Sequence, residues 1–96
     1  MRKYECTYIM DPGLTDEQQQ PLMERFKTLV ADNGGTVETV DKWERRRLAY
    51  EVKGKREGIY VVMNFAGEPA TEAELGRVLG ITDGVLRHLV VRTDTK

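Results

Sequence analysis

A run of three arginines, Arg45–Arg47, is the feature whose residue type and spacing point most clearly to a chemistry. A guanidinium group binds phosphate oxygens through two parallel hydrogen bonds, and aromatic rings such as those of the flanking Trp43 and Tyr50 can stack on unpaired bases. The run therefore indicates RNA binding. Packing within the core or a hairpin is the alternative role for Trp43 and Tyr50. Successive side chains of a strand point to opposite faces, so the three arginines cannot all serve one face.

The arginine run lies in a strongly basic block. Residues 42–56 carry seven basic and two acidic side chains, for a net charge of +5, whereas residues 1–41 carry a net charge of −4 and residues 57–96 one of −2. The whole chain has a net charge of −1, which by itself predicts no nucleic-acid partner. The block structure favours a polyanionic partner. On charge alone, a solvated hairpin whose charges protect an edge strand from aggregation is an equal alternative.

The groups that could support catalysis are isolated from one another. His88 lies in an apolar run without a carboxylate or nucleophile that the sequence places beside it, and Cys6 falls on the apolar side of a predicted strand. Asp11 and Asp16 flank a turn, where capping explains them better than metal binding does. A single cysteine excludes an internal disulfide and a multi-cysteine metal site. We expect no enzyme activity, no metal, no cofactor and no small-molecule substrate.

The length and the hydropathy pattern limit the organisation of the chain. With 96 residues the chain has the size of one small domain, so we expect a single domain over residues 1–96. No stretch approaches the roughly 20 apolar residues of a membrane helix. The residues after Met1 are not apolar enough for a signal peptide. We therefore expect a cytoplasmic protein without a membrane partner.

The first half of the chain predicts a strand, a helix and a long strand. Residues 2–10 alternate, with Tyr4, Cys6, Tyr8 and Met10 on the side predicted to be buried. Thr15 and Gln18 have the spacing of a capping box, and Asn33-Gly34-Gly35 predicts the end of the helix. Pro21 predicts a kink, or a helix that begins nearer to Pro21. Residues 36–41 read as a strand that 43–52 continues.

The second half of the chain predicts a loop, a strand, a helix and a last strand. Residues 53–58 read as a polar loop, and residues 59–65 as an apolar, central strand. Thr71 and Glu74 have the spacing of a second capping box, and Gly80 predicts the end of the short helix. The last strand is predicted over residues 85–92.

This order of elements predicts an α+β, ferredoxin-like βαββαβ sandwich. Right-handed crossovers would put strands one and three at the centre of a four-stranded antiparallel sheet, with both helices on one face and the other face open. The same fold hosts small-ligand sensors and acylphosphatase-like enzymes, which remain the alternative class of function. The loop at residues 11–15 holds an acid and no arginine, which argues against such an enzyme. Residues 59–65 also lack the glycine-aromatic motif of an RNA-recognition sheet.

Several strings of residues carry a resemblance to a known family. They are Met1–Glu5, Asp11-Pro12, residues 34–40, Arg46-Arg47-Leu48-Ala49-Tyr50, Gly58-Ile59-Tyr60, residues 85–87 and residues 90–92. Over essentially the whole chain they resemble the bacterial small-subunit ribosomal proteins of the S-six family. The resemblance implies a ferredoxin-like structural constituent of the small ribosomal subunit without catalysis. It also implies binding to the central domain of small-subunit ribosomal RNA, paired with ribosomal protein S-eighteen, a small basic neighbour.

The resemblance and the basic block together nominate binding residues. The RNA-binding candidates are Arg2, Lys3, Arg45, Arg46, Arg47, Arg87 and Arg92. Tyr50 and Tyr60 are candidates for the partner-binding surface, because an open apolar sheet face or edge invites a protein segment. A net charge of −1 further predicts weak RNA binding by the chain alone and tighter binding beside a basic partner that supplies charge.

Overall fold

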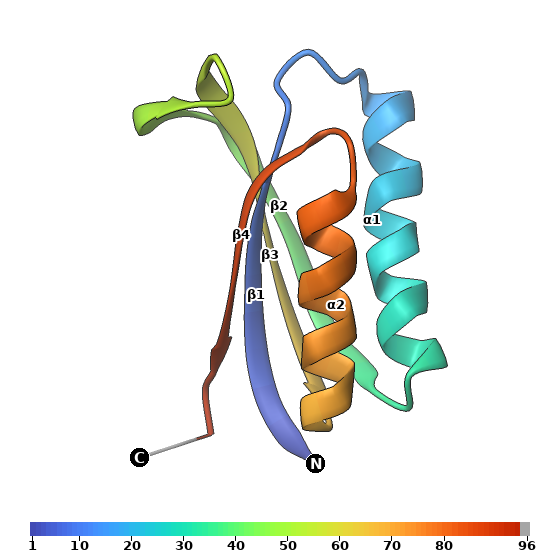
Figure 1. The fold of residues 1–96 in the computed structure, drawn as a ribbon. Coiled ribbons are helices and arrows are strands. Elements are labelled where there is room, and N and C mark those ends of the chain that lie inside the picture. Colours follow the sequence, from blue (N-terminus) through green and yellow to red (C-terminus); the bar gives the residue numbers. More distant parts are fainter. Residues whose placement is uncertain (95–96) are drawn as a thin grey trace.

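In the described part of the chain, four strands and two helices follow one another in the predicted order. The computed structural model describes residues 1–94, so the last two residues of the expected domain lie outside the described residues. The elements are β1 (Arg2–Met10), α1 (Asp16–Asp32), β2 (Thr36–Val52), β3 (Lys55–Gly67), α2 (Pro69–Ile81) and β4 (Val85–Arg92) (Figure 1). All strand pairs are antiparallel, in the sheet order β2-β3-β1-β4.

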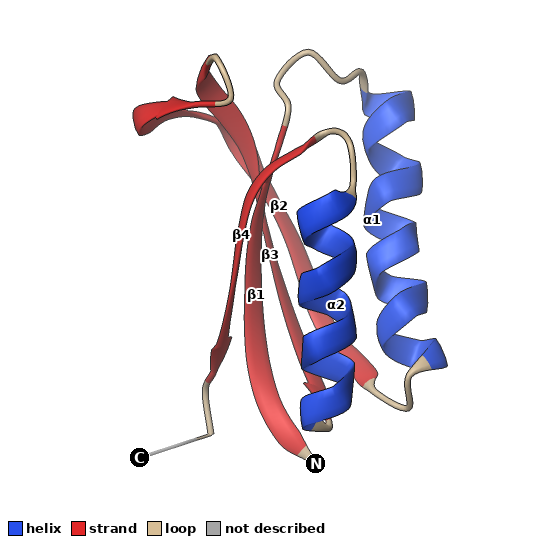
Figure 2. Ribbon diagram, in the orientation of Figure 1, coloured by secondary structure: helices blue, strands red, loops and turns tan. Residues whose placement is uncertain are grey.

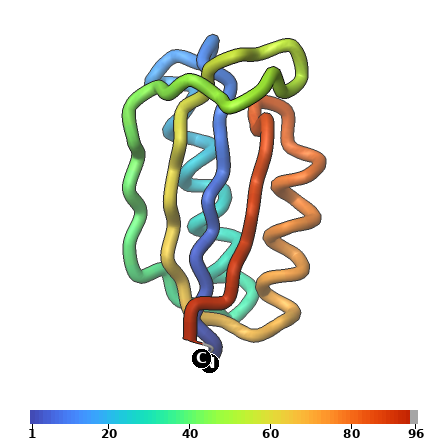
Figure 3. The backbone as a smooth tube through the Cα atoms, turned by 90° about the vertical axis from the view of Figure 1, so that its left-hand side faces the viewer, coloured from blue at the N-terminus to red at the C-terminus, as the bar shows by residue number. Residues whose placement is uncertain are grey.

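The helices form one layer and the sheet forms the other. Both helices cover the same face of the sheet, and no helix of residues 1–94 covers the opposite face (Figure 2). Seen from that open face, β3 and β1 lie at the centre with β2 and β4 at the edges, and the helices lie behind (Figure 3). The predicted ferredoxin-like βαββαβ sandwich is confirmed, including its two central strands.

The core lies between the sheet and the helices. The four side chains predicted to be buried in β1, Tyr4, Cys6, Tyr8 and Met10, are at most 1% exposed. Their cross-strand partners in β3 are Phe65, Met63, Val61 and Ile59. The ring of Tyr4 stacks on that of Phe65 within the sheet, at 5.2 Å between centroids. Tyr8 joins the two layers, because it meets Phe26 of α1 edge to face at 5.0 Å.

The first helix begins where its capping box predicts. The Thr15 hydroxyl accepts a hydrogen bond from the Gln18 amide at 3.3 Å, and the Thr15 amide donates to the Gln18 side chain at 2.9 Å. The alternative start nearer to Pro21 is wrong, because α1 is continuous from Asp16 through Pro21. The exposed proline ring removes one helical donor, so the Glu17 carbonyl accepts no bond from this position.

The second helix begins earlier than predicted and ends later. Glu68 is the N-cap and Pro69 the first helical residue, a position where the fixed φ of proline suits the helix and its missing N–H is not needed. The predicted box at Thr71 and Glu74 is therefore wrong. The Thr71 hydroxyl instead accepts from the Glu68 amide at 3.4 Å and donates to the Asn33 carbonyl at 2.9 Å. The predicted stop at Gly80 is also wrong, because α2 continues to Ile81.

Strands β2 and β3 form a long hairpin with a two-residue turn. Lys53 and Gly54 make this turn with positive φ values of 50° and 79°, the combination of a tight hairpin turn. The predicted loop over residues 53–58 is therefore wrong from Lys55 onward. The polar residues from Lys55 onward lie in β3. The end of the β2–β3 hairpin, which we call the hairpin arm, extends past the helices and curls toward the open side of the sheet (Figure 1).

Candidate nucleic-acid interface

The seven predicted RNA-binding residues gather at two ends of the sheet. Arg92 of β4 lies opposite Tyr4, whereas Arg87 lies opposite Ile9, five residues farther along β1. At strand spacing these two levels are about 17 Å apart. We call the residues at one end the terminal cluster (Arg2, Lys3 and Arg92) and those at the other the hairpin cluster (Arg45, Arg46, Arg47 and Arg87).

The pairing register places the hairpin cluster on more than one face. Ile9 lies opposite both Tyr60 and Arg87, so these three side chains share the open face. Arg46 lies opposite Gly58. A Cβ added at Gly58 would come 2.2 Å from the Ile9 side chain, so Gly58 and Arg46 also face the open side of the sheet. Arg45 lies opposite the core residue Ile59 instead. The arginine run is therefore divided between faces, as the sequence predicts.

Three of the seven candidates are neutralised by carboxylates. Lys3 pairs with Glu38, the Arg45 guanidinium lies 3.8 Å from Glu57, and the Arg92 Nε lies 2.6 Å from Asp94. Arg45 also donates to a backbone carbonyl of the β1–α1 loop, at 2.8 Å. The hydrogen bond to Arg92 holds the pKa of the Asp94 carboxyl below its ordinary value, so this pair stays ionised at neutral pH.

The other four candidates keep their charge available. Within residues 1–94, no carboxylate oxygen lies within 4.0 Å of the side-chain nitrogens of Arg2, Arg46, Arg47 or Arg87. All four side chains are exposed. Three of them belong to the hairpin cluster, so this end of the sheet is the stronger candidate for binding a polyanion.

Two of these arginines lie over aromatic rings. The guanidinium carbon of Arg46 is 4.6 Å from the centre of the Trp43 ring, and that of Arg87 is 5.2 Å from the centre of the Tyr50 ring. Trp43 also stacks on Tyr60 across the β2–β3 pair, at 6.4 Å between centroids and 20° between planes. A neutral ring attracts the cation without cancelling its charge.

The hairpin arm is anchored on the open face. Leu48 is 8% exposed and packs in a small apolar cluster with Ile9 of β1 and Leu86 of β4. In Figure 3 the arm crosses the end of the sheet toward β4. At its tip, Lys53 Nζ donates to the Val85 carbonyl at 3.4 Å. This anchoring brings Tyr50 of β2 to Arg87 of β4.

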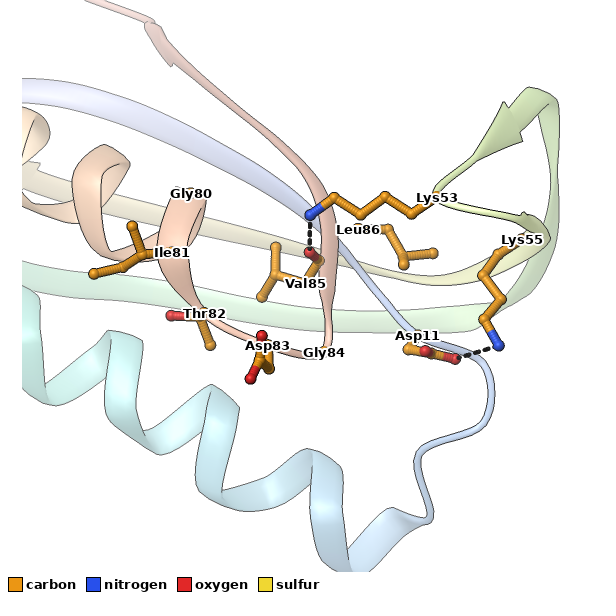
Figure 4. A pocket seen from close by; sticks show the side chains of 10 residues that line it. All are labelled: Asp11, Lys53, Lys55, Gly80, Ile81, Thr82, Asp83, Gly84, Val85 and Leu86. Atoms are coloured by element: carbon orange, nitrogen blue, oxygen red, sulfur yellow. Dashed lines mark hydrogen bonds and ion pairs between the residues drawn. The ribbon is translucent and has the colours of Figure 1, made fainter.

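A pocket beneath the hairpin tip holds charges of both signs. Lys55 Nζ lies 3.7 Å from a carboxylate oxygen of Asp11, and Asp83 lines the same pocket with Lys53 (Figure 4). Neither lysine was among the predicted site residues. Because two carboxylates face two lysines, the pocket is balanced in charge and is a poor anion site. Its lysines serve to hold the hairpin tip.

The candidate partner-binding residues lie on or beside the open face. Tyr60 is half-buried there, and Tyr50 is 59% exposed on the hairpin arm. Two more apolar side chains share this face and were missed: Leu89, opposite Thr7, and Val91, opposite Glu5. They are 63% and 46% exposed. The sequence signal was the apolar run of residues 89–91. The run predicts a strand, but it does not show that the strand lies at the sheet edge with Leu89 and Val91 exposed on the open face.

The side chains considered for catalysis, Cys6, His88 and Asp11, occupy positions in the core, in a strand and in a turn. Cys6 is buried, and burial raises the pKa of its thiol from 9.0 to about 12, so it is not a nucleophile at neutral pH. His88 lies in the edge strand opposite Tyr8, and the Asp11 carboxylate accepts from the Gly13 amide at 2.8 Å. Among residues 1–94, no three His, Cys, Asp or Glu side chains come together as a metal site. No helix in this described part is long and apolar enough to cross a membrane.

Comparison with known proteins gives one consistent result. Residues 3–92 match the family model described as ribosomal protein S6. The chain is 49% identical over 94 residues to "Small ribosomal subunit protein bS6" of Caldanaerobacter subterraneus, covering 98% of this chain and 99% of the relative. It is 53% identical over 92 residues to the protein of that name from Symbiobacterium thermophilum, covering 96% and 97%. The crystal structure of 30S ribosomal protein S6 from Thermotoga maritima superposes with a TM-score of 0.90 at 29% identity, covering 96% of this chain and 87% of the other.

Proposed function

The chain belongs to the ribosomal protein S6 family of small-subunit ribosomal proteins, and from this premise we propose that it binds the central domain of small-subunit ribosomal RNA together with ribosomal protein S-eighteen. The family consists of structural proteins and not of enzymes, so the alternative of an acylphosphatase-like enzyme is set aside. Its members are constituents of the small ribosomal subunit in the cytoplasm.

The observation that carries the RNA proposal is that four of the seven candidates are exposed arginines without a carboxylate partner in the described chain. Arg46, Arg47 and Arg87 lie at the hairpin end of the sheet, and Arg2 lies at the terminal end. Guanidinium groups that are not engaged by protein carboxylates are available to phosphate oxygens. An RNA segment that meets both Arg2 and Arg87 must extend along the strands, since Arg87 lies opposite Ile9, seven residues or about 24 Å along β1 from Arg2.

The partner proposal rests on the rest of the open face. Beyond the hairpin end this face presents Leu89 and Val91 on β4. The Glu5 carboxylate lies opposite Val91, and Asp41 lies at the level of Leu89 on β2, across the two central strands. Neither carboxylate has a basic group within 4.0 Å among residues 1–94. An apolar surface beside unpaired acids fits a basic protein segment better than it fits RNA. We therefore place the basic ribosomal protein S-eighteen on this part of the face.

The two parts of the proposal explain the net charge of −1. Phosphate contacts dominate RNA affinity, so a weakly acidic chain binds RNA poorly alone. A basic partner seated on the acidic and apolar part of the face would cover those acids and add its own cations. The arginines at the hairpin end then remain for the RNA.

The test measures binding to a transcript of the central domain at moderate salt, with this protein alone, with S-eighteen alone and with both. We expect tight binding only with both. Equal affinity with and without S-eighteen would contradict the charge-sharing part, and no binding in any combination would overturn the RNA assignment. A Glu5→Gln, Asp41→Asn variant should weaken the protein pair. Glu72→Gln, which removes one carboxylate from α2 on the other layer, is a control that should not weaken it.

A further inference from the structure

We propose that Trp43 and Tyr50 are positioning residues, whose rings hold the Arg46 and Arg87 guanidinium groups in the orientation that contacts RNA phosphate. This inference rests on the proposed function and assigns roles to two residues on the free protein's own geometry. It differs from the stacking of unpaired bases that exposed aromatic residues beside arginines otherwise suggest.

The first pair exists because β2 is irregular. Trp43 and Arg46 are three residues apart, so in a regular strand their side chains would point to opposite faces. The β2–β3 register shifts between Lys42 and Arg45, and this irregularity rotates the two side chains to the same side. Arg46 then lies over the Trp43 ring at 4.6 Å, while Trp43 is fixed by its stack with Tyr60.

The second pair exists because the hairpin arm crosses the sheet. Tyr50 and Arg87 come from β2 and β4, the two edge strands, which are separated by β3 and β1. The packing of Leu48 against Ile9 and Leu86 carries the arm over the open face (Figure 3). The Tyr50 ring thereby lies 5.2 Å from the Arg87 guanidinium carbon.

The type of contact leaves the arginines able to bind an anion. A ring covers one flat side of the guanidinium and leaves its N–H groups, which lie in the guanidinium plane, for other acceptors. Arg45 and Arg92 differ, because their N–H groups are used by the Pro12 carbonyl and by Asp94. An arginine already held in place loses less conformational freedom when it binds phosphate.

The test is a pair of double-mutant cycles on RNA binding by the complex with S-eighteen, using the central-domain transcript. One cycle combines Trp43→Leu with Arg46→Gln, and the other combines Tyr50→Leu with Arg87→Gln. Each single change should cost about tenfold in affinity, and each double variant should be no weaker than its arginine single. Trp43→Phe and Tyr50→Phe, which keep a ring, should stay within about threefold of the unaltered protein.

Additive losses would overturn the proposal, because a ring that stacks on a base still contributes after its arginine is removed. A second readout needs no RNA: Trp43 is the only tryptophan, so Arg46→Gln should shift its fluorescence while Arg45→Gln should not. Unchanged emission in Arg46→Gln would also overturn it. Absence of RNA binding by the unaltered complex would instead refute the proposed function. The role of Arg46 and Arg87 in phosphate binding would then be refuted as well, for any result of the fluorescence experiment.

Discussion

Arg87 in β4 and Tyr50 in β2 are in contact, with 5.2 Å between the guanidinium carbon and the ring centre, although their strands form opposite edges of the sheet. The contact exists only because the β2–β3 arm folds over the open face. The hairpin end of the candidate interface is therefore built from both edges and depends on how the arm is held.

Replacing Leu48 with alanine should release the arm. Leu48 is 8% exposed against Ile9 and Leu86, so the truncation should cost about 2–3 kcal/mol of unfolding free energy. We also expect faster amide exchange over residues 44–58 and weaker RNA binding by the complex with S-eighteen. Denaturant unfolding and hydrogen exchange measure these effects.

The control for this change is Leu89→Ala. Leu89 is 63% exposed on the same face, so its truncation should change stability by less than about 0.5 kcal/mol. Equal losses of unfolding free energy in the two variants, or unchanged amide exchange in Leu48→Ala, would show that Leu48 does not anchor the arm.

Two glycine-to-alanine changes should shift the free energy of unfolding in opposite directions. At Gly58 a Cβ would lie 2.2 Å from the Ile9 side chain, beneath the hairpin arm, so Gly58→Ala should destabilise the fold by about 1–3 kcal/mol through overpacking. At Gly76, inside α2, a Cβ meets nothing within 4 Å, so Gly76→Ala should stabilise by about 0.5–1 kcal/mol. Chemical denaturation measures the free energy of unfolding of both variants against that of the unaltered protein. A neutral Gly58→Ala would mean that the close approach of β3 to Ile9 is not required.

Stability should fall at alkaline pH because of buried acids in the core. Burial raises the pKa of the Cys6 thiol from 9.0 to about 12, and burial together with the neighbouring Cys6 raises that of the Tyr8 phenol above its ordinary 10.0. The unfolded chain loses these protons first as pH rises. The free energy of unfolding should therefore be constant with respect to these groups below about pH 9, and should decline between about pH 9 and 12.

Cys6→Ala separates the two groups. In this variant the decline in the free energy of unfolding should begin about one pH unit later, where Tyr8 of the unfolded chain starts to ionise. Between about pH 9 and 10 the slope should be shallower than in the unaltered protein by about 1.4 kcal/mol per pH unit. In the unaltered protein at pH 8, Cys6 should react with a thiol reagent only as fast as the chain unfolds. A native thiol that reacts like a free cysteine would contradict the burial argument.

The fold could be predicted because local signals agreed with one another. Alternation in β1, which the apolar Ile9 interrupts, identified the buried side, and the Thr15–Gln18 box with Gly34 bounded α1. The errors arose where tertiary contacts outweigh local preference. Thr71 bonds to the Asn33 carbonyl across the molecule and serves a helix that starts at Pro69, which its spacing to Glu74 did not reveal.

The candidate site was less predictable, because charge pairing is non-local. Lys3 and Glu38 pair across 35 positions, and Arg45 meets the Pro12 carbonyl across 33. No sequence pattern distinguishes these basic residues from Arg46 or Arg87, which have no such acceptor in the described chain. The register shift that joins Trp43 to Arg46 is likewise a property of the β2–β3 pair and not of either strand alone.

The most direct test of the central claim compares two variants that each lose four positive charges, in complex with S-eighteen on the central-domain transcript. One replaces the four candidates that have no carboxylate partner among residues 1–94, Arg2, Arg46, Arg47 and Arg87, with glutamine. The other replaces three ion-paired candidates and a helix arginine with glutamine: Lys3, Arg45, Arg92 and Arg77.

We expect the first variant to lose at least about 100-fold in affinity and to reduce the salt-dependence slope by about 2–4, because phosphate contacts release counterions. The second should stay within about threefold of the unaltered complex. Equal losses in the two variants would show that net charge alone governs binding, and would contradict the assignment of the RNA contacts to the unpaired arginines.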